Sequence, residues 1–269
     1  MKRLVVVLAV IGLLTIGVWG EGMLKVYFLN VGHGDAILVD YGKKEMLIDG
    51  GESDSIVERL RGLVEGSLDV LVATHPDEDH IGGLDKVMQA FSVEALFTNG
   101  DQSADTECYE LFRNAAQNEE LDQVPALLED TIWLGDLAFR VLNPQSASGS
   151  RNESSVVLML EYEDIRFLFT GDIEANGEAA LQQTASPANK TLILKVAHHG
   201  SDTSTSPEFL RWADPELAIV SGDEDDLTPA VIENLGIWGV PFLTTDENGT
   251  ICVSTDGRSI RITTCEEVP

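Results

Sequence analysis

The same succession of apolar runs, an acid and a histidine occurs twice along this chain. This repeat restricts the possible folds more than any other feature. In the first part, one apolar run ends at Asp49 and the next ends before His75. In the second part, the corresponding runs end near Asp172 and before His198, and the acid and the histidine are 26 residues apart in both parts. A duplicated unit that faces itself would bring these four strand ends to one rim, where α/β proteins commonly form their sites.

Hydrophobic periodicity divides the chain into short strands and helices. We predict strands at residues 24–30, 36–41, 45–49, 69–73, 93–98, 131–134, 137–142, 155–162, 165–170, 191–197, 217–220, 241–244, 250–254 and 258–263. We predict helices at about 53–65, 82–91, 105–118, 175–183, 206–213 and 229–236. Strands form hairpins early in each half and then alternate with helices, which is typical of an α/β (α+β) protein whose sheets are covered by helices. No linker divides the chain, so we expect one domain over residues 21–269.

The segment after the fourth predicted strand concentrates the side-chain types that bind metals. Within six positions it contains His75, Asp77, Asp79 and His80. Neutral imidazole and carboxylate groups bind zinc, manganese and iron. A solvated loop rich in Asp is the alternative interpretation, and the other motifs of the chain decide between the two.

Four motifs, in order along the chain, resemble one known family. The segment HPDEDH at residues 75–80 resembles the HxHxDH motif of the metallo-β-lactamase superfamily, with Asp77 in place of the second histidine. The flanking motifs LNVGHGDAILVDYGKKEMLIDGG, FLFTGDIE and LKVAHHGS resemble the hydrolase domain of the DNA-uptake competence proteins and their free-standing relatives. The resemblance covers about residues 23–265. It implies the metallo-β-lactamase fold, a four-layer αββα sandwich of two pseudo-duplicated halves.

The resemblance also implies a centre with one or two divalent metal ions, zinc or manganese. By motif position, the ligands are His75 and Asp77 at the first metal, Asp79, His80 and His198 at the second, and Asp172 as a bridge. Asp79 would also orient a water molecule that the metals activate for attack. The carboxylate of Asp77 shifts the first site from zinc towards manganese or magnesium without excluding zinc. The superfamily usually adds a third histidine to the first site, but residues 81–197 contain none, so a one-metal centre stays open.

Two further histidines are candidates for catalysis or substrate binding. His199 adjoins His198, and only one of two neighbours at a strand end can point at a metal. We therefore predict His198 as the ligand and His199 as a general acid or substrate contact. The resemblance places His33 and Asp35 at the rim of the site, in a glycine-flanked turn where relatives frequently have glutamine at the histidine position. Ordinary hairpin chemistry is the alternative for this turn.

The remaining candidates are polar residues that would support the ligands. Asp49 is expected to bond the metal-bearing loop from outside the ligand set. Asn152 and Ser155 belong to a polar loop that resembles the Asn-x-x-Ser stretch of the competence-type relatives. Ser201 is expected either to bond a ligand or to stabilise a turn.

The chain is strongly acidic, which bears on its substrate. It has 17 basic and 46 acidic residues, and without Lys2 and Arg3 of the N-terminal segment the net charge is −31. Cations that contact phosphates supply most of the nonspecific affinity for DNA. Lys190, Lys195 and Arg151 stand isolated in the sequence, so we expect no strong basic nucleic-acid surface. We interpret the acidic runs 119–120 and 223–226 as solvated faces.

Three functions are compatible with these patterns, and the first is favoured. The first is metal-dependent hydrolysis of a small-molecule or nucleic-acid phosphodiester, by a nuclease or phosphodiesterase. The second is hydrolysis of small esters, thioesters, lactones or β-lactams on the same scaffold, although Asp77 and the HHGS motif differ from β-lactamases proper. The third is a binding or surface module without activity, which the presence of all the inferred ligands disfavours. The sequence does not indicate the oligomeric state.

The N-terminal segment predicts export. Residues 1–20 combine a basic start, an apolar run and small residues before a cleavage point, which is typical of a secretory signal. The alternative is a membrane anchor through residues 4–20 that is not removed. Both place the folded body outside the cytosol.

The cysteine content permits at most one disulfide in such an exported chain. Cys252 and Cys265 are the nearer pair, but a two-residue hairpin turn at Asp256 and Gly257 would place Cys252 opposite Arg261. A bridge between these two cysteines is therefore left open.

Overall fold

The computed structural model describes residues 23–146, 150–184, 190–223 and 226–265. The segment over residues 1–20, expected to be an export signal or anchor, lies outside the described residues. Within the described ranges, none of the helices has both the length and the apolar character needed to cross a bilayer.

The first sheet contains eight strands in the described part of the chain, in the order β15-β14-β1-β2-β3-β4-β5-β6. Its strands are β1 (Leu24–Phe28), β2 (Ile37–Tyr41), β3 (Lys44–Ile48), β4 (Ser67–Ala73), β5 (Ser92–Thr98), β6 (Gln123–Pro125), β14 (Thr250–Thr255) and β15 (Ile260–Cys265). The pairs from β15 to β3 are antiparallel, whereas β3, β4, β5 and β6 run parallel. The loops that follow β3 and β4 therefore meet at one end of the sheet.

The second sheet has seven strands in the same ranges, in the order β13-β12-β11-β10-β9-β8-β7. They are β7 (Thr131–Leu134), β8 (Leu137–Asn143), β9 (Val157–Tyr162), β10 (Ile165–Phe169), β11 (Thr191–Lys195), β12 (Leu217–Val220) and β13 (Phe242–Thr244). Strands β7 to β10 are antiparallel, and β10 to β13 are parallel. The loops after β10 and β11 thus share one end, as those after β3 and β4 do.

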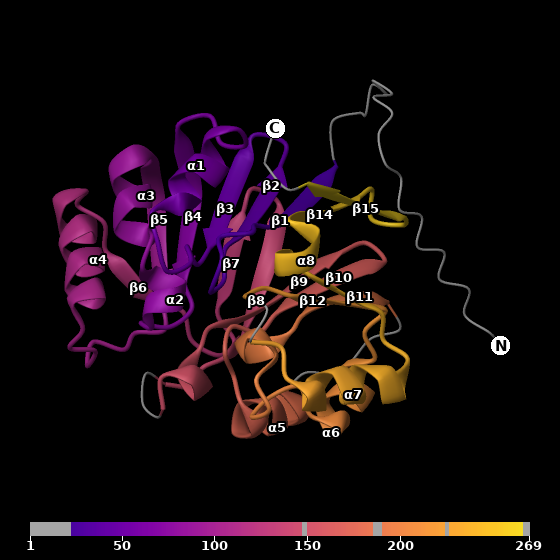
Figure 1. Ribbon diagram of the computed structural model, residues 1–269. Coiled ribbons are helices and arrows are strands. Elements are labelled where there is room, and N and C mark those ends of the chain that lie inside the picture. Colours follow the sequence, from indigo (N-terminus) through magenta and orange to yellow (C-terminus); the bar gives the residue numbers. More distant parts are fainter. Residues whose placement is uncertain (1–22, 147–149, 185–189, 224–225, 266–269) are drawn as a thin grey trace.

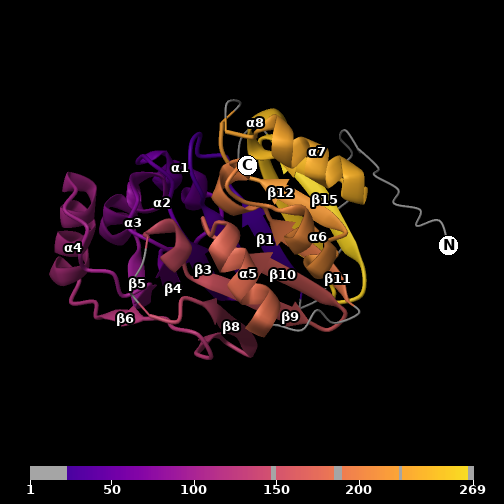
Figure 2. The same ribbon diagram turned by 90° about the horizontal axis from the view of Figure 1, so that it is seen from below.

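Helices cover the outer face of each sheet, so the molecule has the predicted four αββα layers (Figures 1 and 2). Over the first sheet lie α1 (Ser55–Arg61), α3 (Leu84–Ala90) and α4 (Glu107–Asn118). Over the second lie α5 (Ala175–Thr184), α6 (Pro207–Ala213) and α7 (Pro229–Trp238). Two short helices, α2 (Glu78–Ile81) and α8 (Thr245–Asn248), are placed in connecting segments.

Alternation along the strands builds the core between the sheets. In β10, Phe167 and Phe169 face the other sheet, whereas Leu168 between them faces the helices. Phe28 and Phe139 pack against Phe169 in the inter-sheet layer. Burying each such side chain contributes about 1.5–3 kcal/mol. The apolar layer closes the sandwich below the loops that carry the polar motifs.

All fourteen predicted strands are present, with their ends moved by no more than two residues. The six predicted helices are present as well, although the one expected over 82–91 begins at Leu84 because α2 precedes it as a separate turn. Strand β6 and helix α8 were not predicted. They have three and four residues, which is too short for a periodic pattern.

The C-terminal hairpin corrects one expected register. Cys252 lies opposite Thr263, not opposite Arg261, because four residues rather than two separate β14 from β15. Cys265 lies opposite Thr250. Cys252 and Cys265 are both free, so the bridge that the sequence left open is not formed.

Candidate metal centre

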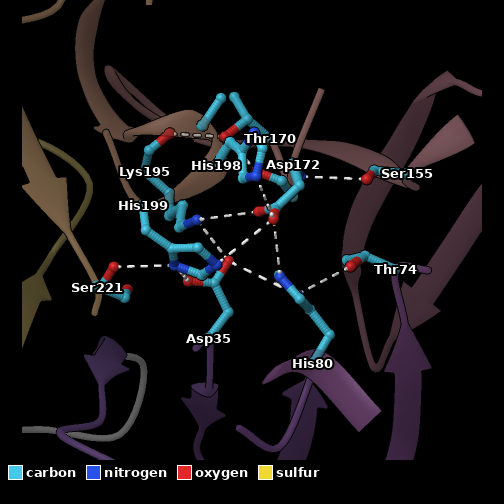
Figure 3. A network of polar contacts seen from close by, with 12 residues as sticks. Asp35, Thr74, His80, Ser155, Thr170, Asp172, Lys195, His198, His199 and Ser221 are labelled. Atoms are coloured by element: carbon cyan, nitrogen blue, oxygen red, sulfur yellow. Dashed lines mark hydrogen bonds and ion pairs between the residues drawn. The ribbon is translucent and has the colours of Figure 1, made fainter. Parts of the chain in front are cut away.

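The metal-binding segment leaves β4 and turns directly into a short helix. Asp77 precedes α2 with an extended backbone (φ −89°, ψ 150°), and Asp79 and His80 lie in the single turn that follows. His80 is fully buried and points from this helix across to Asp172 of the other half (Figure 3). The strand-to-helix turn therefore directs these side chains into the space between the sheets.

Two glycines allow the close backbone contacts that fix this turn. Gly34 has a φ of +104°, and a Cβ there would lie 1.9 Å from the carbonyl oxygen of Asp79. A Cβ on Gly82 would lie 2.3 Å from the carbonyl oxygen of Glu52. In the same region the backbone N–H of Asp35 donates to the Asp79 carbonyl at 3.1 Å. Any larger residue would force these segments apart.

Asp49 holds the turn from beneath. Its Oδ1 accepts the backbone N–H of Thr74 at 2.7 Å, and its Oδ2 accepts the Thr74 hydroxyl at 2.7 Å. Nδ1 of His80 donates to the same Oδ2 at 2.8 Å, which leaves Nε2 of that ring facing the centre. A hydrogen bond of this kind fixes both the tautomer and the orientation of a ligating imidazole.

Asp172 lies in the middle of the cluster, and its two oxygens face different partners. Four imidazole Nε2 atoms surround Oδ2, from His80 at 3.2 Å, His199 at 3.4 Å, His198 at 3.9 Å and His75 at 4.0 Å. Oδ1 instead faces Nζ of Lys195 at 3.9 Å. Burial raises the pKa of Asp172, but the imidazoles of His80 and His199 outweigh burial and hold that pKa well below its usual value. The carboxylate is therefore ionised.

The backbone of His198 and His199 is left-handed, with φ of +49° and +52°. These residues belong to a 3₁₀ turn, Ala197–Gly200, and not to the end of a strand. The rings consequently leave the chain in different directions, and both Nε2 atoms face Asp172. The prediction that only one of the two neighbours can point at the centre is wrong, because it assumed an extended chain.

His199 is held at both ring nitrogens. Its Nδ1 donates to the carbonyl oxygen of Ser221 at 3.0 Å, and its Nε2 lies 3.1 Å from Oδ2 of Asp79. Burial lowers the pKa of His199, but the carboxylates of Asp172 and Asp35 outweigh burial and raise the pKa to about 10. The same balance places the pKa of His80 well above its usual value. Positive charge is therefore favoured at these two rings.

His75 and Asp77 form the other side of the cluster. Nε2 of His75 lies 3.6 Å from Oδ2 of Asp77, and Nδ1 lies 3.3 Å from the hydroxyl of Ser155. The second oxygen of Asp77 accepts from Nη1 of Arg151 at 2.7 Å, at the exposed rim. Burial and the neighbouring His80 lower the pKa of His75 to about 4. His75 is therefore neutral, which is the form that binds metals.

His33 lies at the opposite rim, where a carboxylate orients it. Its side chain is 38% exposed, Nδ1 donates to Oδ2 of Asp226 at 2.9 Å, and Nε2 lies 3.5 Å from Oδ2 of Asp79. The interpretation of the run 223–226 as a solvated face is wrong for Asp226, whose carboxylate binds this ring. Residues 224 and 225 lie outside the described ranges, and residues 119–120 are exposed as predicted.

Asp35 lies beneath the centre, which corrects its expected position at the rim. It is 2% exposed, and its Oδ2 lies 2.5 Å from Nζ of Lys195, which is itself fully buried. The bond from the Asp35 backbone to the Asp79 carbonyl draws the turn inward after His33. Lys195 is not isolated, as its position in the sequence suggested, but is part of the buried cluster.

Asn152 and Ser155 connect the polar loop to the ligand candidates. The hydroxyl of Ser155 donates to the carbonyl of Asn152 at 2.7 Å and accepts the backbone N–H of Asp172 at 3.1 Å. The side-chain amide of Asn152 lies 3.4 Å from Nε2 of His198. These contacts position Asp172 from its main chain and place an amide beside His198.

Ser201 takes the second of its two expected roles, in a turn. Its hydroxyl lies 3.1 Å from Oγ1 of Thr203 and accepts the Thr203 backbone N–H at 3.4 Å. Oγ1 of Thr203 in turn lies 3.2 Å from Nδ1 of His198. Ser201 therefore reaches the centre through Thr203.

The atoms that face this space fit a divalent cation. Nε2 of His75 and Nε2 of His80 are buried and have no hydrogen-bond partner, and both face Oδ2 of Asp172. Asp79, His80, Asp172 and His199 each offer a ligand atom, all within 4.8 Å of one another. A second group, Asp35, Asp49 and His80, meets the same criterion, but Lys195 and Thr74 already engage its carboxylates. Imidazole and carboxylate donors together suit zinc and manganese.

Sequence reasoning missed four contributors, and only some of them left a local signal. Lys195 interrupts the apolar run TLILKVA, and a charge at a buried strand position requires a partner. Thr74 directly precedes His75, but its bonds to Asp49 are made through the fold. Arg151 binds Asp77, which is 74 positions away along the chain, and Asp226 binds His33, which is 193 positions away. No short motif contains either pair.

Comparisons with known proteins agree with this architecture. Residues 29–222 match the Metallo-beta-lactamase superfamily. The chain is 34% identical over 190 residues to ComE operon protein 3 of Bacillus subtilis, which covers 68% of this chain and 24% of that protein. It is 31% identical over 204 residues to Recombination protein 2 of Haemophilus influenzae, which covers 72% of this chain and 23% of that protein. The chain thus spans about a quarter of the length of these relatives.

A solved structure shares the fold. The metallo-beta-lactamase fold protein YhfI of Bacillus subtilis superposes with a TM-score of 0.59, over 87% of this chain and 100% of that chain. The two sequences are 14% identical, so this likeness concerns the fold alone.

Proposed function

This chain is a metal-dependent hydrolase that belongs to the metallo-β-lactamase superfamily, and from this premise we propose that it cleaves phosphodiester bonds. The observation that carries the proposal is the set of four imidazole Nε2 atoms around one oxygen of Asp172. Asp77 adjoins this set on one side and Asp79 on the other. Two ligand sets that share a carboxylate suit displacement at phosphorus, because paired cations stabilise both the attacking and the leaving oxygen.

The geometry supports one division of the ligands. We assign His75, Asp77 and His198 to the first site, Asp79, His80 and His199 to the second, and Asp172 to both. His198 then supplies the third ligand that the first site lacks between residues 81 and 197. In this division His199 is a ligand, and the general-acid role expected from the sequence is not needed for it.

When bound, divalent cations would lower the pKa of a water molecule to give a nucleophile near neutral pH, and would polarise the phosphoryl oxygen. The chain itself supplies orientation. Asp49 and the Ser221 carbonyl hold Nδ1 of His80 and of His199, so that Nε2 of each ring faces the centre. Asp79 lies between His199 and the exposed His33, where its carboxylate can orient an attacking water.

The rim favours a short anionic substrate. Arg151 lies beside Asp77 with its side chain 40% exposed, and a guanidinium is suited to bind a phosphate oxygen pair. The net charge of −29 disfavours a tight grip on long nucleic acid. We therefore infer a nucleotide or a short single strand as the substrate, and the likeness to Recombination protein 2 supports a nucleic-acid origin.

A second candidate is the hydrolysis of small esters, thioesters, lactones or β-lactams. One observation favours it, namely the acidic charge of the chain. This charge repels an anionic phosphodiester but not an uncharged substrate. Family membership argues against the third alternative, a binding module without activity.

Parallel assays separate these functions. The metal-reconstituted protein is offered bis-p-nitrophenyl phosphate, single-stranded DNA and nitrocefin, with zinc and manganese compared at equal concentration. We expect turnover of the phosphodiesters, lost in Asp79→Ala and kept in Asp122→Ala, which removes an exposed acid. Turnover of nitrocefin alone would replace the proposal by the second candidate.

Metal identity and location belong to the same proposal. The carboxylate of Asp77 favours manganese at the first site over zinc. We propose export on the basis of residues 1–20, whose sequence is typical of a secretory signal. Cell fractionation with N-terminal sequencing of the mature protein tests export, since a cytosolic chain that retains this segment would contradict it.

A further inference from the structure

Lys195 is a fully buried lysine that the proposed ligand sets do not use. It is the last residue of β11, on the same strand face as Ile193 of the inter-sheet core. Its side chain therefore runs between the two sheets, and its Nζ faces the carboxylate of Asp172 (Figure 3). A buried ammonium costs several kcal/mol unless it is paired. Its partners should accordingly explain its presence.

Its two partners are acids from different halves of the fold. Nζ lies 2.5 Å from Oδ2 of Asp35, in the turn before β2, and 3.9 Å from Oδ1 of Asp172, in the loop after β10. The main chain of Lys195 is fixed as well, since its carbonyl accepts the hydroxyl of Thr170 at 2.8 Å. The ammonium thus joins the two sheets at the base of the centre.

We propose that Lys195 is a fixed cation of the metal centre, with two separate effects. The first effect is at Asp35, where the ammonium compensates the charge of the buried carboxylate. The group Asp35, Asp49 and His80 therefore needs no metal ion of its own. At Asp172 the ammonium attracts Oδ1, and so holds Oδ2 towards the four imidazoles. Lys195 is a positioning residue, because it faces the ligand carboxylate from the side away from the proposed metal sites.

The two effects predict different outcomes in a double-mutant cycle. Lys195→Met keeps the length of the side chain but leaves both acids without the ammonium. We expect the metal-free variant to unfold about 10 °C below the wild type, because one partner of a buried pair has been removed. Its affinity for Mn²⁺ should fall by about 10- to 100-fold, as when a group that orients a ligand is lost.

Asp35→Asn separates charge compensation from positioning. In the double variant Lys195→Met with Asp35→Asn, no uncompensated carboxylate remains at residue 35, so the unfolding temperature should return to within a few degrees of the wild type. Its Mn²⁺ affinity should stay as low as in Lys195→Met, because Asp172 is still not held. Asp35→Asn alone keeps the Lys195–Asp172 contact and should bind Mn²⁺ within a few-fold of the wild type.

The readouts are Mn²⁺ titration followed by electron paramagnetic resonance, and thermal unfolding in chelator. Lys190→Met is the matched control, since Lys190 pairs with Glu161 at the surface, and it should change neither readout. Wild-type Mn²⁺ affinity in Lys195→Met would overturn the positioning role. Failure of the double variant to recover stability, or to fold, would overturn charge compensation. The inference rests on the proposed metal centre but not on the bond that is cleaved, since neither readout needs a substrate.

Discussion

Asp49 and Asp172 follow corresponding strands in the two halves, stand 26 residues before a histidine in both, and yet act differently. Both oxygens of Asp49 are engaged by Thr74 and His80, so this acid only orients. Asp172 leaves one oxygen to four imidazole nitrogens and therefore lies at the centre. Equal spacing along the chain does not make two acids equivalent in space.

Strand register explains the difference. In the first half Ile48 pairs with Val72, 24 residues later, whereas in the second Leu168 pairs with Leu194, 26 residues later. Asp49 directly follows β3, but Asp172 is the third residue after β10. Asp172 consequently lies beyond the end of its sheet. Asp49 stays at the end of its strand, where its carboxylate accepts the backbone N–H of Thr74. Four tests address this comparison, and we order them by the size of the expected effect.

The largest effect is expected from Asp172→Asn, which keeps the shape of the side chain but removes the charge shared by both ligand sets. Turnover of bis-p-nitrophenyl phosphate should fall by about 10³-fold or more, since metal ions contribute several kcal/mol of transition-state stabilisation. Bound metal, measured by mass spectrometry of the protein, should fall in parallel. Unchanged turnover would show that Asp172 is not a shared ligand, and would contradict its contrast with Asp49.

Asp49→Asn should have a smaller and different effect. Because Asp49 acts through the orientation of His80, we expect about a 10- to 100-fold loss of metal affinity, with turnover recovering at high metal concentration. Titration of activity against Mn²⁺ measures the shift. If saturating metal fails to restore turnover, Asp49 does more than orient, and the contrast with Asp172 is lost.

The stability of the metal-free protein should depend on pH in opposite directions through His199 of the second half and His75 of the first. His199 has its pKa raised to about 10, so its contribution to stability is complete below pH ~6.5 and is lost as pH rises towards 10. His75 has its pKa lowered to about 4, so its contribution is complete above pH ~6.5 and is lost as pH falls towards 4. Each single group changes the free energy of unfolding by at most about 1.4 kcal/mol per pH unit.

Urea denaturation in chelator between pH 4 and 10 measures these two limbs. Stability should be greatest near the middle of the range, and His199→Asn should flatten the alkaline limb while His75→Asn flattens the acidic one. If both variants flattened the same limb of the pH profile, the two histidines would not differ in charge, and the prediction would be contradicted.

The smallest effects concern two threonines whose hydroxyls each bond within one half of the molecule, near the centre. The Thr74 hydroxyl donates to a carboxylate oxygen of Asp49, whereas the Thr170 hydroxyl donates to the carbonyl of Lys195. We expect Thr74→Val to lower the free energy of unfolding by about 1.5–3 kcal/mol and Thr170→Val by about 0.5–1.5 kcal/mol, because bonds to charged groups are stronger. Urea denaturation of both variants tests this order, which the reverse ranking would contradict.

Much of the architecture could be predicted because its causes are local. The alternation in β10 that places Phe167 and Phe169 inward is visible in five consecutive residues. The segment 75–80 was identified in the same way, since its side-chain types are contiguous. Short elements such as β6 were not predicted, because three residues are too few to show a hydrophobic period.

The parts of the candidate site that were missed depend on contacts between distant segments. The directions of His198 and His199 follow from two left-handed residues that no strand pattern indicates. Asp226 was interpreted as solvated because its partner His33 is 193 residues away. Asp35 was placed at the rim because nothing in its own turn indicates the bond that draws it inward.

The order of strands and helices, the four layers and the types of side chain that meet in the centre could all be predicted from the amino-acid sequence. These depend on hydrophobic period and on contiguous motifs, which act over a few residues. Three features became visible only in the folded molecule: Oδ2 of Asp172 faces the imidazoles, Asp49 orients His80, and the buried Lys195 faces the other oxygen of Asp172. The reason is that strand register and backbone turns set directions in space, and a shift of two residues changes what a side chain can reach.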